Sequence, residues 1–178
     1  NKLLKQRDAY IEQAFKGEVV FIPTIKLQTS MKTYTGKRVV SHTAIYIASP
    51  IFDSAGEVIA VFTLRLDPME NFTRILKLGR IGDTGETYAF DKDGILITKS
   101  RFDHHLKLAG EIANDEQGML MIRVADPGGN LLDGYKPVVA KEDRSLTLMV
   151  RKAQAGDFSA YIESYRDYRG VLVFGVWL

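Results

Sequence analysis

The residues with the clearest potential for chemistry lie between 79 and 100, in the segment GRIGDTGETYAFDKDGILITKS. Gly79, Gly82 and Gly85 recur at every third position, as glycines do in loops that wrap around phosphate. A phosphate loop follows a strand and opens a helix, so that free N–H groups face the anion. Here the order is helix, glycines, strand, and no Lys-Ser or Lys-Thr pair directly follows Gly85. We therefore interpret the glycines as a helix-to-strand connection.

The DKDG sequence at 91–94 resembles the start of a calcium-binding loop, where carboxylates alternate along the chain. The next ligand positions fall on Ile95 and Ile97, which offer no side-chain oxygen, and no glutamate closes the frame. Aspartate followed three residues later by glycine is also typical of a tight turn. We interpret 91–94 as a hairpin turn.

Other catalytic and metal-binding patterns are not found in the sequence. His42, His104 and His105 are the only histidines and lack the spacing of a zinc site, and we interpret the adjacent pair as a solvated helix surface. There is no cysteine and no G-x-S-x-G motif, which excludes thiol nucleophiles and a nucleophile elbow. The carboxylates fall at turns and helix starts, where capping explains them. We predict a chain that is not an enzyme and has no cofactor or metal.

Several polar and aromatic side chains occur on strands whose other residues predict burial. A pocket for a small polar ligand combines a few convergent polar groups with apolar walls, and Arg65 is suited to hold a carboxylate by paired N–H bonds. The alternative is that the cations extend from a sheet edge and that the tyrosines are half-buried core residues. The predicted ligand-binding residues are Tyr46, Ser49, Thr63, Arg65, Tyr88 and Lys99.

The first half of the chain predicts a helix followed by antiparallel strands. Apolar residues at helical spacing indicate a helix over 2–16. The segment 19–25 predicts a short strand in which Pro23 marks an edge or a bend. A polar stretch over 28–41 predicts a loop. Two apolar runs, 43–52 and 58–66, predict a hairpin with both faces covered, because their alternation is only partly polar. The sequence Asp67-Pro68-Met69-Glu70 then predicts the start of a helix that ends at Gly79.

The second half predicts shorter elements. Strands are expected on both sides of the 91–94 turn, and a weak helical pattern covers 102–113. Further strands are predicted at 119–124 and 131–139. Ser145 is a suitable cap for a helix that Gly156 ends, and a last hairpin joins 161–168 to 171–178.

One turn pattern, D-x-x-G, recurs four times between predicted strands. Aspartate favours the first position of a type I turn, and glycine accepts the left-handed position that follows. The four turns predict antiparallel hairpins with a few helices packed on them, an α+β fold rather than a doubly wound sheet. The four turns begin at Asp53, Asp91, Asp126 and Asp167.

Length and composition agree with an ordinary folded protein. The 178 residues are 46% hydrophobic and 26% charged, which suffices for one core or two small ones. The net charge of +2 is spread along the chain, so we expect no nucleic-acid partner. The longest apolar run, 171–178, is too short to cross a membrane. The sequence opens within a helical pattern and stops within a strand, and we expect it to be part of a longer protein.

Three segments together resemble the Cache sensor domains of bacterial membrane receptors, in particular the double Cache modules. The first is GRIGDTGETYAFDKDGILITKSRFD, which contains the motif G-x-T-G-E-T-Y-x-x-D-x-x-G-x-L. The second is SPIFDSAGEVIAVFTLRLDPMENFTRIL, and the third is YRDYRGVLVFGVWL at the end of the chain. These segments cover about 42–100 and 161–178, roughly half of the sequence.

The resemblance implies a PAS-like architecture of antiparallel sheets flanked by helices. It implies an N-terminal helix with part of a membrane-distal unit over 1–78, and a membrane-proximal unit over 79–178 that lacks its last strand. The family's usual first half of the distal unit, with its amino-acid-binding pattern, is missing from this sequence. The resemblance therefore leaves the class of ligand open.

The implied function is sensing of a small polar ligand, such as an amino acid or a carboxylate, outside the cytoplasmic membrane. Such a module belongs to a membrane-anchored sensor histidine kinase, chemoreceptor or cyclase, and the resemblance implies a homodimer formed through the N-terminal helix. A structural or dimerisation spacer without ligand is the alternative. A fragment of a secreted hydrolase is a third reading.

Overall fold

The computed structural model describes residues 2–26, 31–32, 38–39, 43–68, 73–157 and 160–177. The chain divides into two compact units, Asn1–Leu78 and Gly79–Leu178. Antiparallel sheets with a few short helices make the fold a mixed α+β one, as the turn pattern predicts. Among the residues just given, no helix has the length and apolar character needed to span a membrane.

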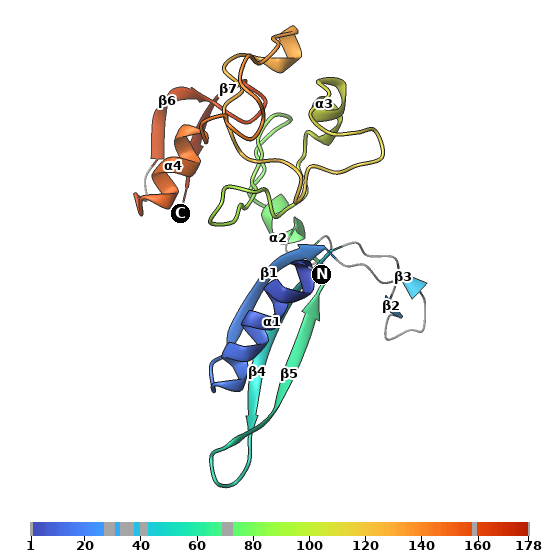
Figure 1. The fold of residues 1–178 in the computed structure, drawn as a ribbon. Helices are drawn as coiled ribbons and strands as arrows, with labels where there is room; N and C mark the ends of the chain where they lie inside the picture. Colours follow the sequence, from blue (N-terminus) through green and yellow to red (C-terminus); the bar gives the residue numbers. More distant parts are fainter. Residues whose placement is uncertain are drawn as a thin grey trace. The chain divides into compact units, whose positions relative to one another are not determined.

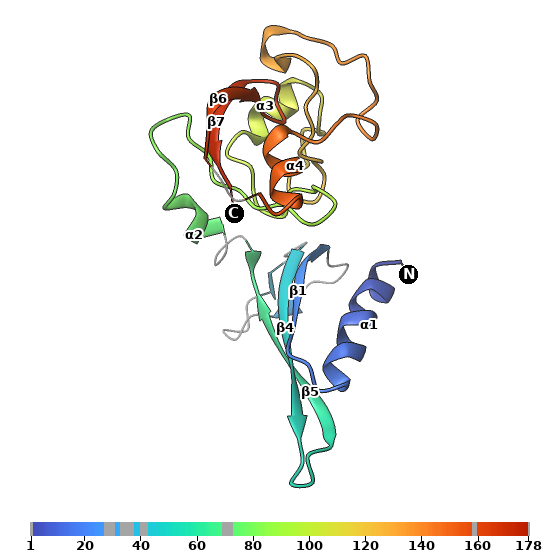
Figure 2. The same cartoon turned by 90° about the vertical axis from the view of Figure 1, so that its left-hand side faces the viewer.

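The first unit is a three-stranded antiparallel sheet with one helix along it (Figures 1 and 2). The helix, α1, packs on one face of the sheet, where Ala14 is fully buried in a cluster with Ile22 and Ala48. The strand order is β1-β4-β5. The elements are α1 (Lys2–Phe15), β1 (Val20–Lys26), β4 (Thr43–Phe52) and β5 (Val58–Leu66). The predicted helix and hairpin are therefore confirmed.

The two faces of this sheet differ in their cover, contrary to the prediction that both are covered. The register pairs Ile47 with both Phe21 and Leu64, so the three side chains form a row on the face away from α1. Phe21 and Leu64 remain exposed, as does the neighbouring Phe62. The prediction was wrong because apolar side chains on both faces of a strand do not show whether another described element packs on each face of the sheet.

Two further predictions in this unit need correction. The stretch 28–41 is not all loop, because β2 (Met31–Lys32) pairs with β3 (Arg38–Val39) as a short antiparallel ladder. The other residues of 28–41 lie outside the described residues, and so does His42, which follows them. The helix predicted to start over 67–70 is described as α2 (Thr73–Lys77), and the residues 69–72 also lie outside the described ones.

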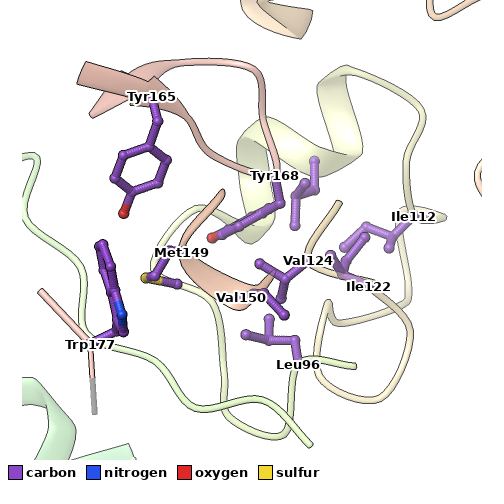
Figure 3. Close-up of a cluster of buried hydrophobic side chains, with 10 residues drawn as sticks. Leu96, Ile112, Ile122, Val124, Met149, Val150, Tyr165, Tyr168 and Trp177 are labelled. Carbon is purple, nitrogen blue, oxygen red and sulfur yellow. The ribbon is translucent and has the colours of Figure 1, made fainter. Parts of the chain in front are cut away.

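The second unit gathers short elements around one apolar core. Figure 3 shows its side chains, which come from segments far apart in sequence. The two strands of the last hairpin pair antiparallel, as predicted, and contribute Tyr165, whereas Trp177 follows directly after them. The elements are α3 (Asp103–Leu108), a 3-10 helix (Leu131–Asp133), α4 (Leu148–Gln154), β6 (Ala160–Arg166) and β7 (Leu172–Val176). The helix predicted over 102–113 is thus much shorter.

Regular strands do not form around the 91–94 turn or over 119–124. Isolated bridges join Phe90 to Leu96 and Ile95 to Arg123, so the segments run antiparallel without a continuous ladder. Leu120 has a φ of 60°, and the Ile122 N–H donates to the Gly118 carbonyl, so a turn interrupts the predicted strand. A bulky residue in the left-handed region is uncommon, and the apolar pattern gives no sign of it.

Two other strand and cap predictions in this unit are wrong. Instead of a strand over 131–139, Asn130 caps the 3-10 helix through its side-chain oxygen, and Gly134 ends it in the left-handed conformation. The cap residue of α4 is Thr147 rather than Ser145, whose carbonyl accepts from the Asp126 N–H. At 130–134 the local side-chain bond outweighs the hydrophobic pattern, whereas Ser145 is held by a backbone bond to a distant segment.

Three of the four D-x-x-G turns adopt one geometry. At Asp53, Asp91 and Asp167 the backbone carbonyl accepts from the N–H of the glycine three residues on, and a side-chain oxygen accepts two further N–H groups. These contacts confirm the turns and their chemistry. The Asp126 turn differs, because its side chain accepts from Gly128, and Gly128 rather than Gly129 takes a positive φ.

Candidate functional site

Four predicted ligand-binding residues belong to the first unit, on β4 and β5. The register pairs Tyr46 with Arg65 and Ala48 with Thr63, which places Tyr46, Thr63 and Arg65 on the face that α1 covers. Tyr46 packs against the apolar cluster beneath α1, as the half-core alternative describes. Ser49 pairs with Phe62 and lies on the opposite face. The sheet therefore brings three of the four side chains together.

The other two predicted residues belong to the second unit. The Tyr88 hydroxyl lies 3.9 Å from the Met149 sulfur, and its ring meets the Tyr168 ring edge-on at 5.6 Å between centroids. Burial raises the pKa of Tyr88 well above its ordinary value. Lys99 is half-buried, between the fully buried Thr98 and Ser100. Tyr88 is thus part of the core wall rather than a free ligand group.

A buried polar cluster lies directly beside Tyr88. The Tyr168 hydroxyl donates to Glu86 Oε2 at 2.6 Å, and the Arg101 N–H donates to Glu86 Oε1 at 2.6 Å. Ser100 Oγ lies 2.7 Å from the Tyr168 hydroxyl and 3.1 Å from Glu86 Oε1, and accepts from the Phe102 N–H. Burial raises the pKa of Glu86, while hydrogen bonds from Tyr168, Arg101 and Ser100 act against it.

A second cluster surrounds Arg169 in the turn of the last hairpin. Its guanidinium donates to Asp167 Oδ2 at 2.9 and 2.7 Å, and lies 3.6 Å from the centroid of the Phe102 ring. The His105 ring stacks on Phe102, and its Nδ1 lies 3.3 Å from Arg169 Nη1. Burial lowers the pKa of His105, and the neighbouring His104 and Arg169 charges act in the same direction. The histidine pair is therefore solvated at His104 only.

The second unit also has a cleft of about 280 Å³ between the Asp126 turn and the loop that leads to α4. This volume is close to the lower end of the roughly 300–1,000 Å³ typical of small-molecule sites. Its lining mixes apolar and polar side chains and is more polar than that of a typical small-molecule site. The lining residues are Asp126, Pro127, Gly128, Tyr135, Val138, Val139, Asp143, Arg144 and Ser145.

The charged side chains that line the cleft differ in how firmly their ion-pair partners hold them. Asp126 pairs with Arg166 Nε at 3.0 Å, and both side chains are partly exposed, at 30% and 43%. Arg144 forms a bidentate pair with Glu111 at 3.0 and 3.2 Å, and both side chains are only 9% exposed. Bidentate buried pairs are geometrically fixed, whereas exposed pairs contribute little to stability and exchange readily with solvent. Asp126 is therefore more open to a ligand than Arg144.

The cleft is connected to the last hairpin through backbone contacts. The Leu131 N–H donates to the Arg169 carbonyl at 3.0 Å, and the Asp126 side chain reaches Arg166 on β6. The Gly170 backbone lies so close to Gly129 that a Cβ atom there would come within 2.5 Å of the Gly129 carbonyl carbon. The segment 126–131 and the turn of the last hairpin are therefore in close contact.

Sequence reasoning missed this cleft and both polar clusters. The signal available in sequence was the Asp126-Pro127-Gly128-Gly129 turn, which was interpreted as a hairpin connection only. Glu86 belongs to the recognised G-E-T-Y segment, but nothing in the sequence indicates that it meets Tyr168. Within the described part of the chain, no group of three or more histidine, cysteine or acidic side chains is arranged to hold a metal ion.

Comparisons of the chain with protein-family models, with curated proteins and with solved structures gave no match. The assignment of a function therefore rests on the residues and on the geometry of the two units.

Proposed function

We propose that the chain is a ligand-sensing module of the Cache type, from the extracytoplasmic part of a bacterial membrane signalling protein. In this proposal the fold is PAS-like, and the module is not an enzyme. It binds a small polar ligand, such as an amino acid or a carboxylate, and passes the signal to a kinase, chemotaxis or cyclase output. The parent protein is anchored in the membrane and works as a homodimer joined through the N-terminal helix.

The observation that carries the proposal is the cleft of the second unit. It combines apolar walls at Pro127 and Val139 with polar groups at Asp126, Tyr135 and Ser145. That combination suits a small molecule with a few polar groups rather than a macromolecular partner. The motif resemblance supports the sensor class, and each of its three segments contains one of the three matching turns, at Asp91, Asp53 and Asp167.

A sensor also needs two arrangements that bind the ligand with different affinity. The partly exposed Asp126–Arg166 pair supplies a contact that a ligand exchanges, since either charge is attractive to a polar ligand of opposite sign. Opening this pair frees β6 from the Asp126 loop. The Leu131–Arg169 backbone bond also joins this part of the chain to the last hairpin, so the ligand shifts the position of that hairpin.

The direct test is a thermal-shift screen of the 178-residue chain with amino acids, carboxylates, amines and purines. A ligand that binds the folded state at 100 times its Kd stabilises it by about 2.7 kcal/mol, which raises the melting temperature. We expect a hit that Ser145→Phe abolishes by filling the cleft. Glu142→Phe, which places the same side chain on an exposed residue outside the cleft lining, is expected to keep the response.

A screen without any hit contradicts the sensing proposal and favours the structural spacer. In that case the sedimentation coefficient shows a dimer that no added compound alters. A hit that survives Ser145→Phe keeps the sensor class but moves its site to another surface, such as the Tyr46–Arg65 region of the first unit. Turnover of a substrate that is lost on changing one carboxylate, with the fold intact, favours the hydrolase alternative.

A further inference from the structure

Glu86, Ser100 and Tyr168 form a cluster, the Glu86 cluster, in which each oxygen contact needs a proton. Three oxygen-to-oxygen contacts form a closed triangle, with Tyr168 to Glu86 at 2.6 Å, Ser100 to Tyr168 at 2.7 Å and Ser100 to Glu86 at 3.1 Å. Each hydroxyl supplies one proton, and an ionised carboxylate supplies none. Two protons therefore have to serve three contacts when Glu86 is charged.

With Glu86 ionised, the Tyr168 proton goes to Glu86 Oε2 at 2.6 Å. The single Ser100 proton then serves either Glu86 Oε1 at 3.1 Å or the Tyr168 hydroxyl at 2.7 Å. One contact of the triangle therefore lacks a proton as long as Glu86 is charged. A neutral carboxyl group supplies the third proton and closes the ring.

We propose that Glu86 is a proton-binding switch, neutral when its ring with Ser100 and Tyr168 is closed and ionised when the ring opens. The proton exchanges with water. The ring joins three parts of the second unit, namely the segment before the 91–94 turn, the segment before α3 and the turn of the last hairpin. Ionisation therefore loosens the hairpin that the proposed ligand cleft also contacts, which makes protons an input separate from the ligand.

Burial favours the neutral form of Glu86, whereas the hydrogen bonds from Tyr168, Arg101 and Ser100 favour the ionised form. Burial raises the pKa of Glu86 above the ordinary 4.5, and the positive charge of Arg169 lowers it. That guanidinium already forms a close pair with Asp167, which reduces its effect on Glu86. Tyr88 and Tyr168 add no charge at neutral pH, because burial raises the pKa of both hydroxyls well above their ordinary value.

The sign of the pH dependence follows from linkage. Since the folded pKa of Glu86 is raised, its contribution to stability is fully present below the unfolded value of 4.5 and is lost as pH rises through the folded pKa. Glu86→Gln reproduces the neutral ring, because the amide N–H donates to Tyr168, Tyr168 to Ser100, and Ser100 to the amide oxygen. That variant is expected to lose this contribution to the pH dependence and keep the closed hairpin.

The test is a pH titration of the whole chain labelled with ¹³C at the glutamate carboxyl groups. We expect one glutamate to titrate above the ordinary range, to vanish in Glu86→Gln and to persist in Glu142→Gln, a matched change on an exposed residue. Tyr168→Phe removes a donor to the carboxylate and is expected to raise the pKa of that glutamate further. In parallel, Trp177 fluorescence is expected to show that the unfolding of Glu86→Gln depends less on pH across the same interval than the unfolding of the unmodified chain does.

Two results overturn the proposal. One is a titration in which all glutamates of the unmodified chain change at or below the ordinary range, a measurement that needs no variant to fold. The other is a pH dependence of unfolding that Glu86→Gln leaves unchanged. Neither result depends on a ligand being found, so failure here is distinct from failure of the sensor proposal.

Discussion

The three matching D-x-x-G turns allow one substitution to be compared in three surroundings. Gly56, Gly94 and Gly170 occupy the same turn position, with φ values of 86°, 77° and 78°. Replacing each by alanine imposes the same left-handed strain, so differences among the variants report only what the added methyl group meets. At Gly56 it meets nothing within 4 Å, at Gly94 it overlaps the end of Leu146, and at Gly170 it overlaps the backbone of Gly129.

The expected magnitudes rise in that order. Left-handed alanine costs about 1–2 kcal/mol, which is the whole effect at Gly56. At Gly94 the end of the Leu146 side chain has to move within a packed core, and overpacking of this kind adds about 1–3 kcal/mol. At Gly170 the backbone itself has to separate, which breaks the Leu131–Arg169 hydrogen bond and leaves polar groups unpaired, so we expect about 4 kcal/mol or more.

The assay uses urea unfolding with two signals. Trp177 is the only tryptophan, and it is buried in the second unit with its indole N–H bonded to the Asp157 carbonyl, so its fluorescence reports on Gly94→Ala and Gly170→Ala. Far-ultraviolet circular dichroism follows Gly56→Ala in the first unit. If Gly170→Ala unfolds at the same urea concentration as Gly94→Ala, the close approach of the hairpin to the Asp126 loop is refuted.

Two further substitutions test other contacts by urea unfolding. Glu111→Gln breaks a buried bidentate pair and is expected to destabilise the second unit by about 3–5 kcal/mol. The double change Glu111→Leu with Arg144→Met should cost clearly less, and an equal or larger cost contradicts the desolvation argument. In the first unit, Ala48→Leu overpacks the contact beneath α1 and is expected to cost about 1–3 kcal/mol. Ser49→Leu, on the opposite face, should cost less than that.

Local patterns predicted the first unit well. The hairpin of 43–52 and 58–66 was predicted with the bounds that the structure has, because alternating apolar residues and the Asp53 turn act over short distances. The same local reasoning failed over 119–124. The positive φ at Leu120 and the turn around it depend on neighbouring segments, and no residue type in that stretch predicts them.

The candidate sites were harder to predict for a related reason. Glu86 meets Ser100 and Tyr168 across sequence separations of 14 and 82 residues. Each of these residues has an ordinary explanation when considered alone, as a loop acid, a small polar residue and a core aromatic. What makes them a cluster is the packing of the last hairpin, and that packing follows from the whole fold rather than from any pattern of spacing.

The second unit also explains why its polar residues are poor guides to a ligand site. Its described segments form isolated bridges more often than continuous ladders, so many backbone N–H groups need side-chain acceptors. Asp91, Asp167 and Glu86 each accept backbone N–H bonds and so stabilise the fold itself. Asp126 does so too, but its remaining bond, to Arg166, is partly exposed, and Asp126 itself lines the cleft. A ligand gains most where a polar group is held firmly by the fold and keeps one exchangeable partner, and Asp126 fits that description better than the six residues that the strand patterns selected.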